Sequence, residues 1–174
     1  MILVSVIVAI GVGAAPAASP GNPLAMAEKG YLQCYRPDVQ NKTCQSIASY
    51  RRTGPGTYDN KAVLPISSDG PTTLETHTPV VVRNGAVCGQ IRARDFMAGT
   101  LRVDGSAVPP EEAKPVLEAM AQAVRPFANK EICTRYEPSA GDLTAKITIA
   151  GKYQADQDEP VKWITDAEGY TVTR

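Results

Sequence analysis

The chain has 174 residues with 18 basic and 18 acidic side chains and one histidine, so its formal net charge is zero. Nucleic-acid binding normally needs a basic face that displaces counterions from phosphates, and a balanced charge provides no such field. The same balance argues against attachment to anionic lipid by charge alone. We therefore expect no nucleic-acid partner, and the length is that of a single domain behind a short leader.

The N-terminus has the pattern of a secretory signal peptide. Residues 2–12 form an apolar run that is too short for the about 20 residues of a spanning helix. Ala25-Met26-Ala27 then supplies a small-x-small cleavage motif. We predict a signal peptide over 1–27, a single domain over 28–174 without a stable membrane span, and a periplasmic or secreted location at the bacterial envelope. Ala15-Pro16-Ala17 fits the same rule, so a mature N-terminus at Ala18 stays open.

Four cysteines remain after such a cut, at Cys34, Cys44, Cys88 and Cys133. An exported chain leaves the reducing cytosol, which predicts two structural disulfides rather than free thiols. We favour Cys34 with Cys44, and Cys88 with Cys133, because the second pair lies on the same side of two predicted strands. Zinc sites favour closely spaced cysteines and histidines, and a Cys-x-x-Cys redox motif is absent. We predict no metal and no cofactor.

Short β-prone runs separated by turn residues make up most of the chain. Asn84-Gly85 predicts a type I′ hairpin in which Arg83 faces Ala86 and Val81 faces Cys88. Pro65 marks its strand as an edge strand. In chain order, we predict strands at 31–35 and 58–66, hairpins at 78–91 and 100–108 around a helical turn at 94–98, strands at 131–136 and 143–149, and a closing hairpin at 161–173. Residues 44–52 suit a helix or a strand equally well.

One long amphipathic helix is predicted at 111–126. Pro109-Pro110-Glu111-Glu112 is typical of a helix N-terminus, and apolar residues then recur at three- and four-residue steps. A helix of this kind covers one face of one sheet. The sequence therefore predicts a single α+β domain, in which a largely antiparallel twisted sheet of about five to seven strands packs on one long helix and is stapled by disulfides.

The only histidine, His77, is the one candidate for a histidine general base. Glu75 lies two residues away and shares its face in an extended segment. A Gly-x-Ser-x-Gly nucleophile motif is absent from the sequence, so we assign no catalytic residue. Asp156, Asp158 and Glu159 lack the glycine and the distal glutamate of a calcium loop. His77 and Glu75 thus remain weak candidates for one alternative, a small extracytoplasmic hydrolase that uses His77 or paired carboxylates.

The absence of catalytic motifs favours a non-enzymatic exported binding or accessory module. Its expected partner is a protein or an envelope component. The expected recognition surface is the sheet face away from the helix, with the side chains of Arg83, Arg92, Arg94, Arg135 and Tyr136. No motif in the sequence is specific enough to indicate a family.

Overall fold

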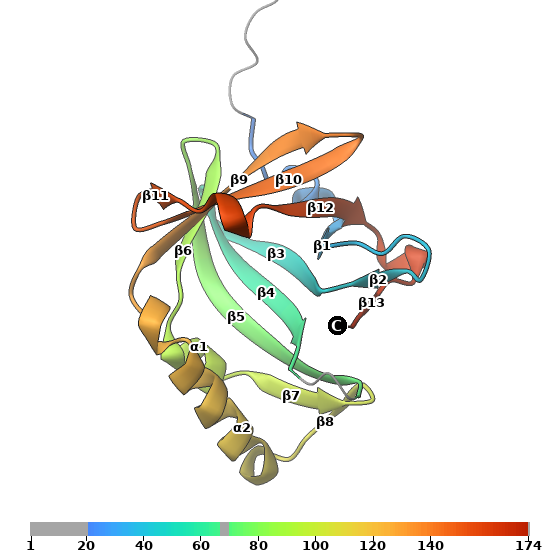
Figure 1. Cartoon of the computed structure of the whole chain (residues 1–174), viewed down its shortest axis with the longest axis vertical. Helices are drawn as coiled ribbons and strands as arrows, with labels where there is room; N and C mark the ends of the chain where they lie inside the picture. The colour runs from blue at the N-terminus through green and yellow to red at the C-terminus, as the bar shows by residue number, and fades with distance from the viewer. Residues whose placement is uncertain (1–20, 67–69, 174) are drawn as a thin grey trace, which may run out of the picture.

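The structure is a computed structural model that describes residues 21–66 and 70–173 (Figure 1). Its centre is a closed antiparallel β-barrel of eight strands. The pairing between β4 and β5 closes the ring. Around the barrel the strands follow the order β4 (Thr57–Pro65), β3 (Ser46–Gly54), β1 (Leu32–Tyr35), β12 (Glu159–Ile164), β10 (Asp142–Ile149), β9 (Glu131–Ser139), β6 (Ala86–Gln90) and β5 (Thr72–Arg83).

The other described elements surround this barrel. The strands among them are β7 (Thr100–Val103) and β8 (Ser106–Ala107), which extend from β5, β11 (Lys152–Tyr153), which pairs with β10, and the parallel pair β2 (Thr43–Cys44) and β13 (Thr171–Val172). The helices are α1 (Ala93–Met97), α2 (Pro110–Ala123) and the 3-10 turns η1 (Ala27–Lys29), η2 (Arg125–Phe127), η3 (Ala155–Gln157) and η4 (Asp166–Glu168). Within the described ranges, none of these helices has the length and apolar character needed to cross a bilayer.

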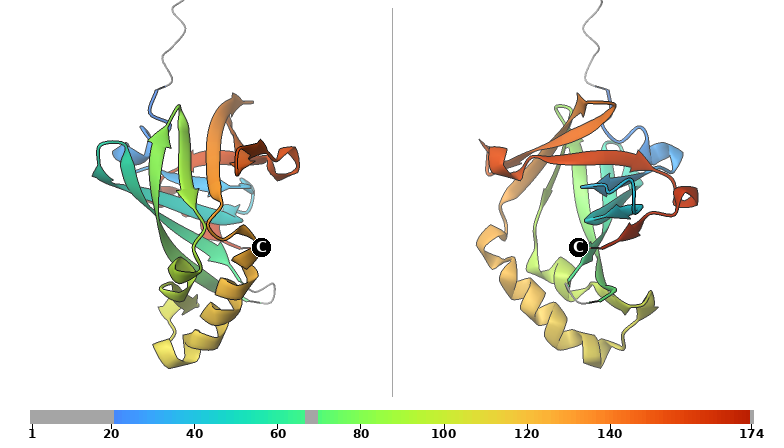
Figure 2. Two further views of the ribbon diagram at one scale, coloured as in Figure 1. Left: turned by 90° about the vertical axis from the view of Figure 1, so that its left-hand side faces the viewer. Right: turned by 45° about the vertical axis from the view of Figure 1, so that its right-hand side comes forward.

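The predicted open sheet packed on one long helix is wrong, because the sheet closes on itself. The long strand β5 pairs with β4 along one edge. Along its other edge, the second half of β5 pairs with β6 and the first half pairs with β7. Helix α2 packs on this β7 branch, where its buried Ala113 and Leu117 meet Leu74 and Leu101. Figure 2 shows α2 beside β7 at one end of the molecule. The helix therefore covers a side branch, and the barrel buries its own inner face.

Several local elements are confirmed. The 78–91 hairpin has the predicted register, with Arg83 opposite Ala86 and Val81 opposite Cys88. Its turn residues Asn84 and Gly85 both have positive φ, 51° and 73°, as a type I′ turn requires. The helical turn at 94–98 corresponds to α1, and the long helix corresponds to α2, which ends at Ala123 and is followed by η2.

Two strand assignments are wrong. β4 is not an edge strand, since it pairs with both β3 and β5. Pro65 is its last residue, so the missing N–H does not interrupt the strand interior. The segment 161–173 is not a hairpin, because β12 pairs with β1 and β10, whereas β13 pairs with β2. The undecided segment 44–52 is mostly strand β3.

Two disulfides staple the barrel, and they are the pairs that the sequence favours. Cys34–Cys44 joins β1 to β2, and both cysteines are buried against Ile164 in a small cluster. Cys88–Cys133 joins directly opposed residues of β6 and β9. Disulfides of this kind form and persist in oxidising compartments, so their presence is consistent with a location outside the cytosol.

Replacing each disulfide by an alanine pair should lower the free energy of unfolding by unequal amounts. The sequence separation is 45 residues for Cys88–Cys133 and 10 for Cys34–Cys44. On the chain-entropy model the losses are about 4 kcal/mol and about 3 kcal/mol. Urea unfolding of the two double variants, compared with the parent, measures both. A larger loss for the Cys34→Ala/Cys44→Ala variant would contradict a mechanism based on loop length.

Candidate functional site in the barrel interior

Polar side chains from three strands meet inside the barrel. Every second residue of a strand points to the same face, so Gln33 and Tyr35 both enter the interior from β1. Tyr50 enters from β3 and Tyr136 from β9. Gln33 has no exposed surface, and each of the three tyrosines lines a cavity. A carboxamide and three phenols thus share one interior.

The three phenol hydroxyls converge on a single acceptor. The Oη atoms of Tyr35, Tyr50 and Tyr136 lie 3.0, 2.9 and 3.0 Å from Gln33 Oε1. The hydroxyls of Tyr35 and Tyr136 are also 2.6 Å apart, and those of Tyr50 and Tyr136 are 3.4 Å apart. A carbonyl oxygen has two lone pairs, so it cannot fully accept all three protons. One hydroxyl must direct its proton to a neighbouring phenol or to another acceptor.

These hydroxyls stay protonated. Burial raises the pKa of Tyr35 and of Tyr50 well above that of an ordinary tyrosine. Tyr136 adds to both pKa shifts, whereas the hydrogen bond with Tyr35 acts against the shift at Tyr50. Burial also raises the pKa of Tyr136, against the hydrogen bonds that it receives from Tyr35 and Tyr50. Removing a phenolate from water without a cation is costly. The polar end of the interior is therefore neutral and rich in O–H donors.

The tyrosines form one wall of a cavity of about 190 Å³. Aliphatic side chains form much of the remaining wall, and among the described residues no lysine, arginine, histidine or carboxylate lines it. The lining residues beyond the three tyrosines are Asn60, Thr78, Val80, Val87, Gly89, Gln90, Ile91, Ile132 and Thr134. The cavity thus combines an uncharged polar end with an apolar body, as small-molecule sites commonly do.

Asn60 adds an acceptor to this lining. Its Oδ1 atom is buried and has no hydrogen-bond partner among the described residues. A buried carbonyl oxygen without a donor costs about 1–3 kcal/mol. A molecule that brings an N–H or O–H group to Asn60 therefore gains an interaction that the protein alone leaves unmade.

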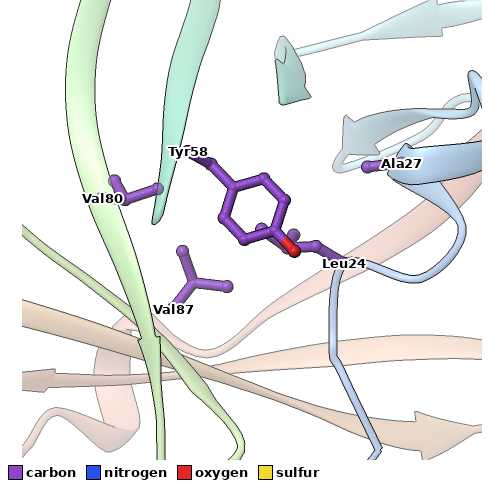
Figure 3. Packing of buried hydrophobic residues seen from close by; sticks show 5 residues of the cluster. All are labelled: Leu24, Ala27, Tyr58, Val80 and Val87. Carbon is purple, nitrogen blue, oxygen red and sulfur yellow. The ribbon is translucent and has the colours of Figure 1, made fainter. Parts of the chain in front are cut away.

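The chain segment before β1 packs into the barrel next to this cavity. We call residues 22–30 the N-terminal plug. Leu24 and Ala27 of the plug are buried against Tyr58, Val80 and Val87 (Figure 3). Val80 and Val87 also line the cavity, so the plug packs directly against two residues of the cavity wall.

His77 and Glu75 lie together on the outer side of the barrel wall, as two residues of one strand face. His77 Nδ1 is 2.9 Å from Asp59 Oδ2, and His77 Nε2 is 3.7 Å from Glu75 Oε1. The side chain of His77 is 53% exposed. Both ring nitrogens face carboxylates rather than a hydroxyl nucleophile, so this arrangement resembles a surface ion-pair group. A catalytic role for His77 or Glu75 stays a prediction.

The expected recognition residues are dispersed. Tyr136 lies inside the barrel, while Arg83 pairs with Glu131 on the outside. The remaining three arginines also have intramolecular partners: Arg92 and Arg94 face Asp95, and Arg135 donates to the carbonyl oxygen of Asn84. The sequence groups these five residues on an open sheet face away from the helix. A closed barrel has no such face. Partner binding through these arginines stays a prediction.

One group of possible metal ligands occurs among the described residues, formed by Cys88, Glu131 and Cys133. The two sulfurs are joined in a disulfide, so neither can serve as the thiolate that a metal needs. Glu131 is paired with Arg83 at 2.6 Å. This group is therefore a structural disulfide beside an ion pair, and it lacks the free ligand atoms of a metal centre.

Sequence reasoning missed most of the interior site. Gln33, Tyr35, Tyr50 and Asn60 carried no recognised motif. The available signal was alternation: Gln33 and Tyr35 are two residues apart, as are Thr134 and Tyr136. Polar and aromatic residues that share a face with aliphatic ones, as Tyr136 does with Ile132, indicate an interior that is partly polar.

Comparisons with known proteins do not identify the chain. No family model matches its sequence, and neither a curated protein nor a solved structure matches it. The chemistry of the cavity is therefore the main guide to function.

Alkaline titration should separate the interior tyrosines from the exposed ones. A pKa that is raised in the folded state means that the phenols of Tyr35, Tyr50 and Tyr136 stabilise the fold below the pKa of an unfolded tyrosine, about 10. This stabilisation is lost as the pH rises above that value. Phenolate absorbance and circular dichroism, followed together, should show part of the seven-tyrosine signal appearing only with unfolding.

The Tyr50→Phe variant provides the control for this titration. The exposed tyrosines should ionise reversibly in the folded protein, and the interior ones should ionise only when the protein unfolds at higher pH. The variant should lose the absorbance of one phenol from the second step and none from the first. Titration of all tyrosines in the native protein, with a common midpoint of about 10, would contradict a buried cluster.

Proposed function

We propose that this chain is a non-enzymatic binding module that acts outside the cytoplasm and holds a small neutral molecule in the barrel cavity. The observation that carries the proposal is the convergence of three phenol hydroxyls on Gln33 Oε1 beside an otherwise apolar cavity. The unpaired Oδ1 of Asn60 in the lining leaves acceptor capacity for a ligand, and the phenol hydroxyls form the polar end of the same cavity.

The lining indicates the charge of the ligand. Because no ionisable side chain other than the neutral tyrosines lines the cavity, a bound anion or cation would lose its hydration without gaining a counter-ion. Such a burial is strongly unfavourable. The ligand that fits best has one neutral group with both a donor and an acceptor, such as a carboxamide, and an apolar body that packs on Val80, Val87 and Ile132.

The volume indicates the size of the ligand. A dry cavity of about 150 Å³ accommodates a benzene ring, and this cavity is about 190 Å³. The site therefore suits a single ring with a small substituent, or a short chain of similar volume.

The extracytoplasmic part of the proposal is supported by the disulfides and by the sequence of the leader. Both disulfides suit an oxidising compartment. The apolar run at 2–12, followed by small-x-small motifs, is typical of an export signal. The run and Ala15-Pro16-Ala17 lie outside the described ranges, whereas Ala25-Met26-Ala27 lies within them. Periplasmic or secreted location, and the wider expectation of a protein or envelope partner, remain proposals.

A series of benzene derivatives tests the binding site. Benzamide should shift the NMR signals of the Val80, Val87 and Ile132 methyl groups. Benzoate has nearly the same shape but carries a charge, so its affinity should be at least about tenfold lower. Toluene should bind through its apolar ring alone. Binding of benzoate with an affinity equal to that of benzamide, or shifts confined to the outer surface, would contradict the proposal.

The Asn60→Leu variant isolates the polar contact, since leucine has a similar volume and no acceptor. It should weaken benzamide binding about five- to tenfold, the loss of one hydrogen bond, and leave toluene binding intact. Lys61→Leu is the matched control, because Lys61 follows Asn60 on the same strand and points outward to Glu75. Equal benzamide affinities for the two variants would exclude Asn60 from the site.

A further inference from the structure

The N-terminal plug is part of the hydrophobic core. Leu24 has no exposed surface and Ala27 is 8% exposed. Both pack on Tyr58, Val80 and Val87, which come from three neighbouring strands of the barrel wall (Figure 3). Few other residues in the described ranges are as completely buried as Leu24. A leader that is removed on export has no reason to fill a core position.

Polar contacts fix the plug in one geometry. Asn22 Oδ1 accepts a hydrogen bond from the Leu24 N–H at 3.0 Å, and Asn22 Nδ2 donates to Tyr58 Oη at 2.9 Å. Tyr58 in turn donates to Glu28 Oε1 at 2.6 Å, and Arg52 lies 3.7 Å from the same carboxylate. These contacts bind residues on both sides of the Ala25-Met26-Ala27 motif to β3 and β4.

Cleavage after Ala27 would remove half of this arrangement. The product would begin at Glu28 and would lack Asn22, Leu24 and Ala27. The rings and methyl groups that they cover would face water, and the hydroxyl of Tyr58 would lose one of its partners. Because Val80 and Val87 also line the cavity, this cut would uncover part of the cavity wall.

We propose that residues 22–30 remain in the mature protein as the structural floor of the barrel, and that the export signal is removed upstream, after Ala17. Ala15-Pro16-Ala17 satisfies the small-x-small rule as well as the later motif does. A cut there leaves the four residues Ala18 to Gly21 ahead of the plug in the sequence. The proposal rests on the export part of the proposed function and is independent of ligand binding.

The N-terminal residue of the exported protein decides the proposal. The full precursor is produced in a bacterial host, and the intact mass of the protein recovered from the periplasm or the medium is measured. A chain that begins at Ala18 is the expected result. A chain that begins at Glu28 would overturn the retention of the plug while export still stands. A chain recovered there that still begins at Met1 would overturn processing after Ala17, and a chain found only in the cytoplasm would overturn export as well.

Thermal stability provides a second measurement. Leu24→Ala deletes buried methyl groups and should lower Tm by about 5–15 °C, the range expected for a leucine truncated in the core of a domain of this size. Lys29→Ala is the matched control, because Lys29 is an exposed residue of the same plug, and it should change Tm by less than about 2 °C. A chain produced directly from Glu28 should lose at least as much as Leu24→Ala. Equal Tm values for all of these proteins would overturn the role of the plug.

Discussion

The fold depends on one buried contact that joins opposite walls of the barrel. The amide oxygen of Gln33 on β1 lies within 3.0 Å of phenol hydroxyls from β1, β3 and β9. β1 and β9 are separated by β12 and β10 in the sheet, so the contact between Tyr35 and Tyr136 reflects the strong curvature of the sheet in the closed barrel. Hydrogen bonds in such an interior are strengthened by the low local dielectric, and a buried polar group without a partner, such as Asn60 Oδ1, is correspondingly costly.

This constraint explains the composition of the interior. A barrel of eight strands has room for side chains or for one small ligand, and here the space is shared. Leu24 of the plug and the rings around Tyr58 fill one end. The tyrosines and Asn60 mark the polar wall of the remaining cavity. Neutral hydrogen-bonding groups beside aliphatic walls suit a neutral ligand.

Local sequence signals predicted local structure well. Asn84-Gly85 predicted the register of its hairpin, and the prolines at 109 and 110 predicted the start of α2, because turn and cap chemistry act within a few residues. Barrel closure was not predictable in the same way. Alternation shows that a strand has two faces, but it does not show whether the inner face meets a helix or the opposite wall. The apolar stripe of α2 suggested the former, and it packs instead on the β7 branch. Tyr136 was accordingly expected at a surface, and residues 22–27 were expected in a leader.

Closure can be measured directly as proximity between the rings of Tyr35 and Tyr136. In an open sheet with the same strand order, three strand spacings of about 4.8 Å would place their backbones about 14 Å apart on a gently twisted surface. In the closed barrel their hydroxyls are 2.6 Å apart. Selective labelling of tyrosine and NMR should therefore show a nuclear Overhauser effect between the ε protons of Tyr35 and Tyr136. Absence of that signal, with the usual signals between adjacent strands present, would contradict the closed barrel and the site inside it.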